Sequence, residues 1–391
     1  MIKRNIKNLI IKSFKEYPVI SIIGPRQSGK TTLVQNMFPK KPYVNLEDIE
    51  NREFALNDPK GFLAQYNEGA IIDEAQKVPE LFSYIQTIVD KKRKNGMYIL
   101  TGSQNFLLME KVSQTLAGRT AIFKLLPLTL SEISKQKGFL NKSIEDILHK
   151  GLYPKLFIQK MNINFYYSNY IQTYIERDVR QIKNIGSLSK FQKFLKLCAG
   201  RTGQLLNITS LANDCGITFH TANDWLSVLE TSFIIFLLKP YYKNYNKRVI
   251  KMPKIYFYDT GLLCSLLNIA DAKQLNDHYL KGGIFESFVV SEFIKDGYNK
   301  GLENIAYFWR DKTGNEVDLL LEQNNNLTAI EIKSSKTITQ DYFKALNYYN
   351  KISGNKSANS YIIYTGQEIQ KRTFGNVITW KQLAQSQNFS K

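Results

Sequence analysis

Residues 24–32 read GPRQSGKTT and follow PVISII, a short apolar run with the β-branched composition of a buried parallel strand. They fit the pattern G-x-x-x-x-G-K-[ST] at every fixed position. In such a segment the glycines let backbone N–H groups close around phosphate oxygens, and the following helix adds the positive end of its dipole. We expect that helix over 32–38, ending before Pro39. The spacing therefore predicts a strand, a phosphate-binding loop and a helix.

Two polar side chains of the loop have expected roles. Lys30 is expected to reach the β- and γ-phosphates of ATP, and the Thr31 hydroxyl to complete the shell of a Mg²⁺ ion. A glycine-rich surface turn is the competing interpretation, and the strand before the loop and the helix after it argue against that. The predicted nucleotide-binding residues are Gly24, Pro25, Arg26, Gln27, Ser28, Gly29, Lys30, Thr31 and Thr32.

A second apolar strand, AIIDE over 70–74, ends in two carboxylates. We expect Asp73 to hold Mg²⁺ through water and Glu74 to polarise the water that attacks the γ-phosphate. Many strands run into acidic turns, so this pattern alone says little. It becomes informative because it follows a phosphate-binding loop at a suitable distance.

Two more polar positions in this third of the chain are candidates for catalysis. The run MYILT over 97–101 leads to Ser103 and Gln104, at the strand end where ligands bind in open α/β sheets. Either side chain could contact the γ-phosphate or the water, and an ordinary strand-ending turn is the alternative. Arg119 precedes a strand expected over 121–125 and is a candidate finger on the ATP of a neighbouring copy. A solvated arginine is the alternative there.

Length, charge and hydropathy limit the remaining choices. A chain of 391 residues predicts two or three domains. A net charge of +19 favours polyanionic partners, although a lysine-rich composition throughout the chain explains it equally well. No apolar run reaches the roughly 18 to 20 residues of a membrane span. Three widely spaced cysteines indicate neither a disulfide framework nor a zinc site. We therefore expect a cytoplasmic protein with no membrane partner.

The middle of the chain has the pattern of a winged helix-turn-helix. After an aromatic helix expected over 165–185, a short helix is predicted over 208–213 and a second from Thr218 to about 229. Strands at 233–238 and 254–258 flank a basic, tyrosine-rich loop. Such a unit would read or touch DNA, and a protein–protein spacer is the alternative. The residues expected to face DNA are Thr218, His220, Thr221, Asn223, Lys243, Lys247, Arg248 and Lys251.

In the last third, three acids and a lysine follow one another on predicted elements. Glu286 lies on an amphipathic helix over 282–293, and Asp318 precedes the apolar run 319–321. Glu331 and Lys333 stand two apart in a strand over 328–335, so they point to one face. Two carboxylates on paired strands could share a Mg²⁺ ion while the lysine orients water. A half-buried strand without chemistry is the alternative.

Two resemblances add to this interpretation. The segments GPRQSGKTTL, YVNLED, IIDEAQKVPELF, ILTGSQNFLLM and TLAGR resemble, in order, the AAA-type ATPase domain of a large bacterial and archaeal family. Its members carry a winged-helix segment and a C-terminal domain of unknown function. The resemblance implies that Asp73 and Glu74 form the Walker B pair, that Ser103 and Gln104 hold the sensor position, and that Arg119 acts in trans in a homo-oligomer.

The C-terminal pattern resembles the restriction-endonuclease-like PD-(D/E)xK core. The resemblance implies that Asp318 is the leading acid, that Glu331 and Lys333 form the E-x-K, and that Glu286 supports them. Val317 stands where the motif has proline.

Together these patterns predict an α/β multidomain protein. The expected parts are a P-loop NTPase parallel sheet over 1–135, a helical extension over 136–203, a winged helix-turn-helix over 204–268 and a restriction-endonuclease-like α/β domain over 280–391. The expected function is Mg²⁺-dependent binding and hydrolysis of ATP by a protein that engages DNA. The alternatives are a nucleotide-switched regulator that binds protein partners and an ATP-regulated, metal-dependent nuclease.

Overall fold

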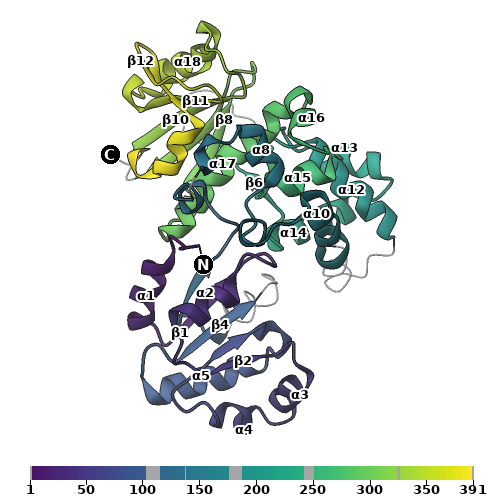
Figure 1. The fold of residues 1–391 in the computed structure, drawn as a ribbon, viewed down its shortest axis with the longest axis vertical. Helices are drawn as coiled ribbons and strands as arrows, with labels where there is room; N and C mark the ends of the chain where they lie inside the picture. The colour runs from purple at the N-terminus through teal and green to yellow at the C-terminus, as the bar shows by residue number, and fades with distance from the viewer. Residues whose placement is uncertain are drawn as a thin grey trace. The chain divides into compact units, whose positions relative to one another are not determined.

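The computed structural model describes residues 2–102, 115–136, 138–175, 187–241, 251–323 and 326–389. The chain forms two compact units (Figure 1). The first comprises Met1–Leu128 with the short segments Thr231–Phe233 and Tyr298–Gly301. The second comprises Thr129–Glu230, Ile234–Gly297 and Leu302–Lys391. In the described part of the chain, no helix has both the length and the apolar character needed to cross a membrane.

The first unit is built on a five-stranded parallel sheet in the order β2-β3-β4-β1-β5. Its two central strands, β1 and β4, are buried along their whole length, as the apolar runs in the sequence predict. The strands are β1 Val19–Ile23, β2 Tyr43–Asn45, β3 Ile71–Asp73, β4 Tyr98–Gly102 and β5 Thr120–Lys124. The helices are α1 Lys7–Glu16, α2 Lys30–Met37, α3 Ile49–Asn57, α4 Pro59–Ala64 and α5 Leu81–Lys92.

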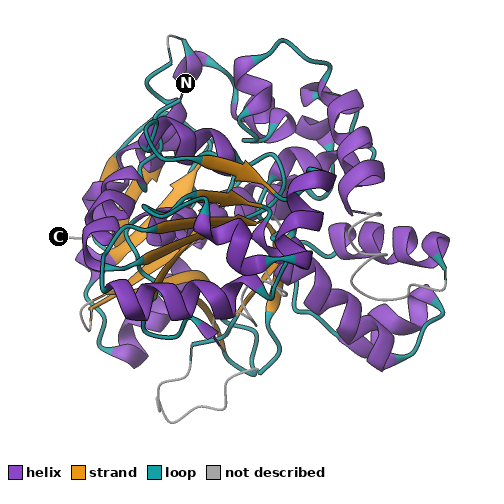
Figure 2. Cartoon of the chain, turned by 90° about the horizontal axis from the view of Figure 1, so that it is seen from below, coloured by secondary structure: helices purple, strands orange, loops and turns teal. Residues whose placement is uncertain are grey.

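The second unit contains helices that come before and after a short hairpin in the sequence, and the ends of two of them belong to segments of the first unit. They are α7 Leu130–Ile133, α8 Ile144–Lys150, α9 Lys155–Ile158, α10 Ile163–Tyr170, α12 Leu188–Gly200, α13 Ile208–Cys215, α14 Phe219–Thr231, α15 Thr260–Leu266, α16 Ala272–Asp277 and α17 Lys281–Asn299. The antiparallel hairpin pairs β6 Ile235–Leu238 with β7 Lys254–Phe257. Figure 2 distinguishes the helices, in purple, from the strands, in orange.

The elements predicted for the middle of the chain are present with small shifts in their bounds. The helices expected over 208–213 and from Thr218 to about 229 are α13 and α14, and each ends two residues later than expected. Thr218 caps α14, because its Oγ1 accepts a hydrogen bond from the Thr221 backbone N–H at 3.1 Å. The aromatic helix expected over 165–185 begins at Ile163 and continues as a π-helix over Ile171–Ile175; its remainder lies outside the described residues.

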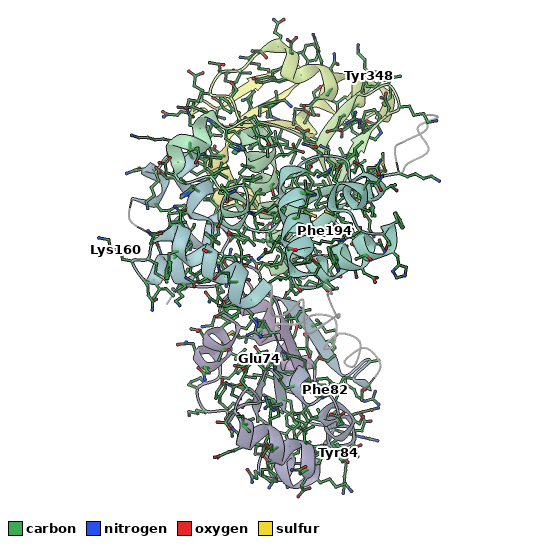
Figure 3. The ribbon with its side chains drawn as sticks, turned by 90° about the vertical axis from the view of Figure 1, so that its right-hand side faces the viewer. Glu74, Phe82, Tyr84, Lys160, Phe194 and Tyr348 are labelled. Atoms are coloured by element: carbon green, nitrogen blue, oxygen red, sulfur yellow. The ribbon has the colours of Figure 1, made fainter. Side chains whose placement is uncertain are left out.

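An aromatic contact holds α12 against α14. The rings of Phe191 and Phe194 each meet the Trp225 indole edge-on, with centroids 5.3 Å apart (Phe194 is labelled in Figure 3). All three side chains are buried, and edge-to-face pairs of this kind add about 0.5–1.5 kcal/mol beyond the burial of their surface. The two helices therefore pack as one block.

The second unit ends in a six-stranded mixed sheet in the order β12-β13-β11-β10-β9-β8. Strands β8, β9 and β10 form an antiparallel meander, and β10, β11 and β13 run parallel. Strand β9 begins three residues before the apolar run 319–321 and ends two residues after it. The bounds are β8 Ala306–Arg310, β9 Glu316–Gln323, β10 Asn326–Lys333, β11 Ser360–Tyr364, β12 Gln370–Arg372, β13 Gly375–Thr379 and helix α18 Lys344–Ser353.

One buried carboxylate ties three segments of the second unit together. Asp259 accepts hydrogen bonds from the Leu152 N–H at 2.6 Å, the Tyr167 hydroxyl at 2.7 Å and the Leu262 N–H at 2.9 Å. The last of these caps α15, and the other two come from the segment after α8 and from α10. Burial raises the pKa of Asp259, and these donors oppose that rise. The carboxylate is thus the common acceptor of groups that are distant in sequence.

Replacing Asp259 with alanine is expected to destabilise the second unit by roughly 3 kcal/mol or more, because each buried donor left without an acceptor costs about 1–3 kcal/mol. The measurement is thermal or urea unfolding of the full chain, compared with Asp277→Ala, which removes an exposed carboxylate from α16. Equal stability of the two variants would contradict the role given to Asp259.

Candidate functional site

The predicted phosphate-binding loop connects β1 to α2, as the sequence indicates. Two of its glycines are required by the backbone. A Cβ on Gly24 would lie 2.1 Å from the Leu125 carbonyl oxygen, and Gly29 has a φ of 92° where it caps α2. Helix α2 begins at Lys30, two residues before the predicted start, so the loop passes directly into the first helical turn. The first N–H groups of this helix are therefore next to the loop.

Lys30 lies over its own loop. Its side chain is only 6% exposed, and its Nζ donates to the carbonyl oxygens of Gly24 and Pro25, both at 2.9 Å. Ser28, also on the loop, has a fully buried hydroxyl with no hydrogen-bond partner among the described residues. A buried ammonium and an unsatisfied hydroxyl are groups that a bound polyphosphate would engage.

Asp73, at the end of β3, is held by hydroxyl groups from three other elements. Its Oδ2 accepts from Thr31 Oγ1 on α2 at 2.8 Å and from the Tyr43 hydroxyl on β2 at 2.9 Å. Its Oδ1 accepts from Thr101 Oγ1 on β4 and from the Glu74 N–H at 3.2 Å. The carboxylate is 5% exposed. Its position is therefore fixed before any ligand arrives.

Glu74 follows Asp73 in an unusual backbone conformation, with φ 54° and ψ 41°. A non-glycine residue in the left-handed region costs free energy, and such residues cluster at functional sites. Asp73 is buried, whereas Glu74 is partly exposed (Glu74 is labelled in Figure 3). Glu74 Oε2 accepts from Gln76 Nε2 at 2.5 Å, on the short 3₁₀ turn Ala75–Lys77.

These residues fit a Mg²⁺–nucleotide complex. Mg²⁺ prefers oxygen ligands and usually binds proteins through one or two side chains together with phosphates and water. Thr31 Oγ1 and Asp73 Oδ2 supply two such oxygens 2.8 Å apart, next to the loop that would hold the phosphates.

Tyr43, Thr101 and Arg4 are the residues that sequence reasoning missed at this site. Arg4 braces the loop region by donating to the carbonyl oxygens of Ser28 at 2.8 Å and Leu126 at 2.6 Å. The one available signal was the position of Thr101, a polar residue at the end of the apolar run MYIL in a fully buried strand. For Tyr43 and Arg4 nothing in the local sequence indicated a partner.

Of the other predicted catalytic residues, Ser103 and Gln104 lie outside the described residues. Arg119 is described, and it forms a two-point ion pair with Asp90 on α5, with Nε–Oδ1 2.5 Å and Nη2–Oδ2 2.8 Å. Both side chains are partly exposed. The role of Arg119 as a trans-acting finger stays a prediction.

The second predicted site is also assembled. Asp318 on β9 and Lys333 on β10 approach to 3.5 Å, and Lys333 Nζ lies 2.6 Å from Glu331 Oε1 on the same strand face. Asp318 Oδ2 also accepts from the Ile332 backbone N–H at 2.8 Å. Glu286 projects from α17 into the same group of charges. The structure thus brings all four predicted residues together.

Sequence reasoning missed three members of this group, which come from β7 and β9. Lys254 Nζ lies 2.9 Å from Glu286 Oε1, 2.5 Å from Glu316 Oε1 and 3.9 Å from Asp318 Oδ1. Tyr256 donates its hydroxyl to Glu286 Oε1 at 2.5 Å. The one charged residue in the otherwise apolar segment KIYF was the signal that could have revealed Lys254. We call Lys254, Tyr256, Glu286, Glu316, Asp318, Glu331 and Lys333 the carboxylate cluster.

Burial dominates the protonation of the carboxylate cluster. It raises the pKa of Glu286 to about 7, although Lys254 opposes the rise. Burial and then the charge of Asp318 raise the pKa of Glu331 to about 8, against the effect of Lys333. Burial alone would lower the pKa of Lys254, but Tyr256 and the surrounding carboxylates outweigh it, so the pKa of Lys254 lies well above its usual value.

The cluster does not fit the shared Mg²⁺ ion expected between Asp318 and Glu331. Within the described ranges, no three Asp, Glu, His or Cys side chains are placed to hold a metal ion together. The physical reason is the position of the lysines: Lys254 Nζ lies between Glu286 and Glu316, and Lys333 Nζ lies beside Glu331 and Asp318.

Three family models match successive parts of the chain. The AAA domain model matches residues 16–134. Models described as Domain of unknown function (DUF8612) and Domain of unknown function (DUF4143) match residues 141–273 and 281–383. The AAA match covers the five-stranded sheet, the loop and the acidic pair, and it confirms the predicted P-loop AAA-type domain.

Among solved structures, the Walker-type ATPase PABY2304 of Pyrococcus abyssi aligns with a TM-score of 0.47 at 14% identity, covering 68% of this chain and 96% of that one. A DNA replication initiation factor aligns with a TM-score of 0.30 at 16% identity, covering 55% of this chain and 69% of that one. Likeness at this level carries no functional argument.

Curated relatives match at the sequence level. An uncharacterized protein of Haemophilus influenzae is 20% identical over 376 residues, covering 87% of this chain and 89% of that protein. The uncharacterized protein Rv2008c of Mycobacterium tuberculosis and its Mycobacterium bovis counterpart Mb2031c are each 30% identical over 324 residues, 82% of this chain and 71% of theirs. On that identity and coverage, the chain belongs to the same family as the mycobacterial proteins Rv2008c and Mb2031c.

Proposed function

We propose that this protein binds and hydrolyses ATP with Mg²⁺ and that it engages DNA through its second unit. The observation that carries the ATPase part is the hydroxyl network around Asp73. It places a buried carboxylate 2.8 Å from the Thr31 hydroxyl, at the first turn of the helix that follows the loop. A structural acid in a strand-ending turn would not require a threonine from the phosphate-binding loop as its partner.

Each residue of the site then has a distinct task. The loop backbone and Lys30 bind the phosphates, and Lys30 exchanges its contacts with Gly24 and Pro25 for phosphate oxygens. Thr31 and Asp73 would hold Mg²⁺, which would supply charge neutralisation at the β- and γ-phosphates. Glu74 orients and polarises the attacking water, and its carboxylate is held by the hydrogen bond that it accepts from Gln76 Nε2.

The DNA part of the proposal rests on charge near the helix pair α13 and α14. Lys190, Lys193 and Lys196 are exposed at intervals of three along α12, which packs on α14 through Trp225. Lysines at this spacing lie on one side of a helix. Of the predicted wing residues, Lys251 is exposed, whereas Lys243, Lys247 and Arg248 lie outside the described residues. The lysines on α12, together with Lys251 just before β7, would contact phosphates without reading bases.

A protein partner for the second unit is the alternative that one observation favours. Helix α14 has no lysine or arginine, and its exposed side includes Phe219, which is 55% exposed, and His220 paired with Asp224 at 3.3 Å. An exposed aromatic side chain and an acid on the same helix suit a protein surface better than a phosphate backbone. Thr218, Thr221 and Asn223 remain the polar groups that base readout would use.

We expect Asp73→Asn to lower ATP hydrolysis by about a hundredfold or more, since it keeps an oxygen for the hydroxyls but removes the charge that faces Mg²⁺. Tyr43→Phe removes one of several hydrogen bonds to Asp73 and should lower the rate by less than about tenfold. The measurement is steady-state phosphate release with Mg²⁺ and ATP. Tyr66→Phe, elsewhere in the first unit, is the control for loss of a tyrosine hydroxyl. Undiminished hydrolysis in a Lys30→Ala variant would contradict the assignment of this loop as the ATP site.

For DNA binding we expect a steep salt dependence that weakens in a Lys193→Ala/Lys196→Ala variant. Each lost phosphate contact should reduce the slope of log K against log salt by about one, so the double variant should lose roughly two. Fluorescence anisotropy with duplexes of unrelated sequence measures this, and Lys273→Ala/Lys351→Ala is the charge-matched control. Binding that ignores salt, or equal slopes for both variants, would favour the protein-partner alternative.

A further inference from the structure

Among the described residues, three cations face four carboxylates in and beside the carboxylate cluster. Glu286, Glu316, Asp318 and Glu331 supply the negative charges, and Lys254, Lys333 and Arg310 supply the positive ones. The group is therefore short of one positive charge if every carboxylate is ionised. Consistent with this shortage, the pKa of Glu331 is raised to about 8, and its Oε2 is buried with no hydrogen-bond partner in the described parts of the chain.

Lys254 is the most enclosed of the three cations. Its side chain is 3% exposed, compared with 28% for Lys333 and 35% for Arg310. Burying an ammonium costs several kcal/mol unless charged partners compensate. Here the partners are carboxylates from two elements, Glu286 on α17 and Glu316 on β9, at 2.9 and 2.5 Å. A surface lysine that happened to pair with an acid would not be buried in this way.

The strand β7 places this ammonium by ordinary strand geometry. Lys254 and Tyr256 are two residues apart, so both point to the same face of β7. Both contact Glu286 Oε1, the lysine at 2.9 Å and the tyrosine at 2.5 Å. Backbone pairing with Leu238 in the hairpin and with Leu205 fixes the strand at this position. The ammonium is thus held by β7 from one side and by the acids from the other.

A divalent cation would compete with Lys254 for the oxygens of the cluster. Oxygen ligands approach Mg²⁺ at about 2.0–2.1 Å, and they must converge on one point. In this protein the oxygens of Glu286 and Glu316 converge on Nζ instead. Substituting a neutral residue for Lys254 would leave four carboxylates facing two cations, a deficit equal to the charge of one divalent ion.

We propose that Lys254 is the resident cation of the carboxylate cluster and closes it to divalent metal ions, so that the C-terminal sheet domain carries a nuclease-like set of residues in a metal-free, lysine-neutralised form. Withdrawal or removal of Lys254 converts the cluster into a site for a divalent cation of the Mg²⁺ or Mn²⁺ class. This inference goes beyond the proposed ATPase and does not depend on it. It also accounts for intact acids at Glu286, Asp318 and Glu331 without requiring DNA cleavage.

The test is Mn²⁺ binding by the full chain without nucleotide, measured by titration calorimetry or by electron paramagnetic resonance of the free ion. Every protein carries Asp73→Asn, which removes the carboxylate of the first unit's predicted metal site. With Lys254 intact we expect no saturable binding to the cluster. Lys254→Met should bind one Mn²⁺ at least about tenfold more tightly, because a buried positive charge has been removed within about 4 Å of the ligands.

Two controls locate the gained site. Adding Asp318→Asn to Lys254→Met should abolish the gain, and Lys251→Met, which removes an exposed lysine three residues away, should cause none. If Lys254→Met fails to fold, as circular dichroism would reveal, Lys254→Gln replaces it.

The Mn²⁺ titration of the protein with Lys254 intact can overturn the proposal by itself. One tight Mn²⁺ ion that disappears on Asp318→Asn alone would overturn the proposal, as would a folded Lys254 variant that gains no Mn²⁺. Neither result would bear on ATP hydrolysis, which is measured separately on the protein with Asp73 intact.

Discussion

The hydrogen bonds to Asp73 are the constraint on which the nucleotide site depends. One carboxylate accepts from Thr31 on α2, Tyr43 on β2 and Thr101 on β4, so it joins the loop's helix to three neighbouring strands. Because β4 lies between β3 and β1, Thr101 also spans the distance between the acidic strand and the loop. A change in the register of any one strand would move a partner of Asp73. The geometry of the site therefore depends directly on the register of the sheet.

The carboxylate cluster of the second unit differs from this site in how the charge of its buried acids is compensated. In the first unit a buried acid is surrounded by neutral hydroxyls, which fix its position and leave its charge available to a cation. In the second, four acids are grouped closely enough that burial raises the pKa of Glu286 and Glu331, and lysines from within the chain supply most of the compensating charge. The contrast explains why acidic residues that predict a metal site in both places fit a Mg²⁺ ion in the first unit but not in the second.

Local patterns in the sequence predicted the parts of the structure that depend on local rules. The strand, loop and helix around Lys30 and the Glu331–Lys333 pair follow from spacing within a few residues, and both are present. The predicted ends of α13 and α14 were each two residues too early, because side-chain spacing defines the ends of helices poorly. Tyr43 and Lys254 were missed for a different reason. Their partners, Asp73 and Glu316, lie 30 and 62 residues away along the chain. The pairing of β2 with β3 brings Tyr43 to Asp73, whereas Lys254 and Glu316 lie on strands of different sheets and meet only through tertiary packing.

Glu74→Gln tests the central claim most directly, because it separates binding from turnover. The amide keeps the size and hydrogen-bonding capacity of the side chain but cannot polarise water as a carboxylate does. The variant should bind Mg²⁺–ATP as tightly as the unaltered protein in an equilibrium titration and should hydrolyse it about a hundredfold more slowly in a single-turnover experiment. Unchanged hydrolysis with Gln at position 74 would contradict the account of this site.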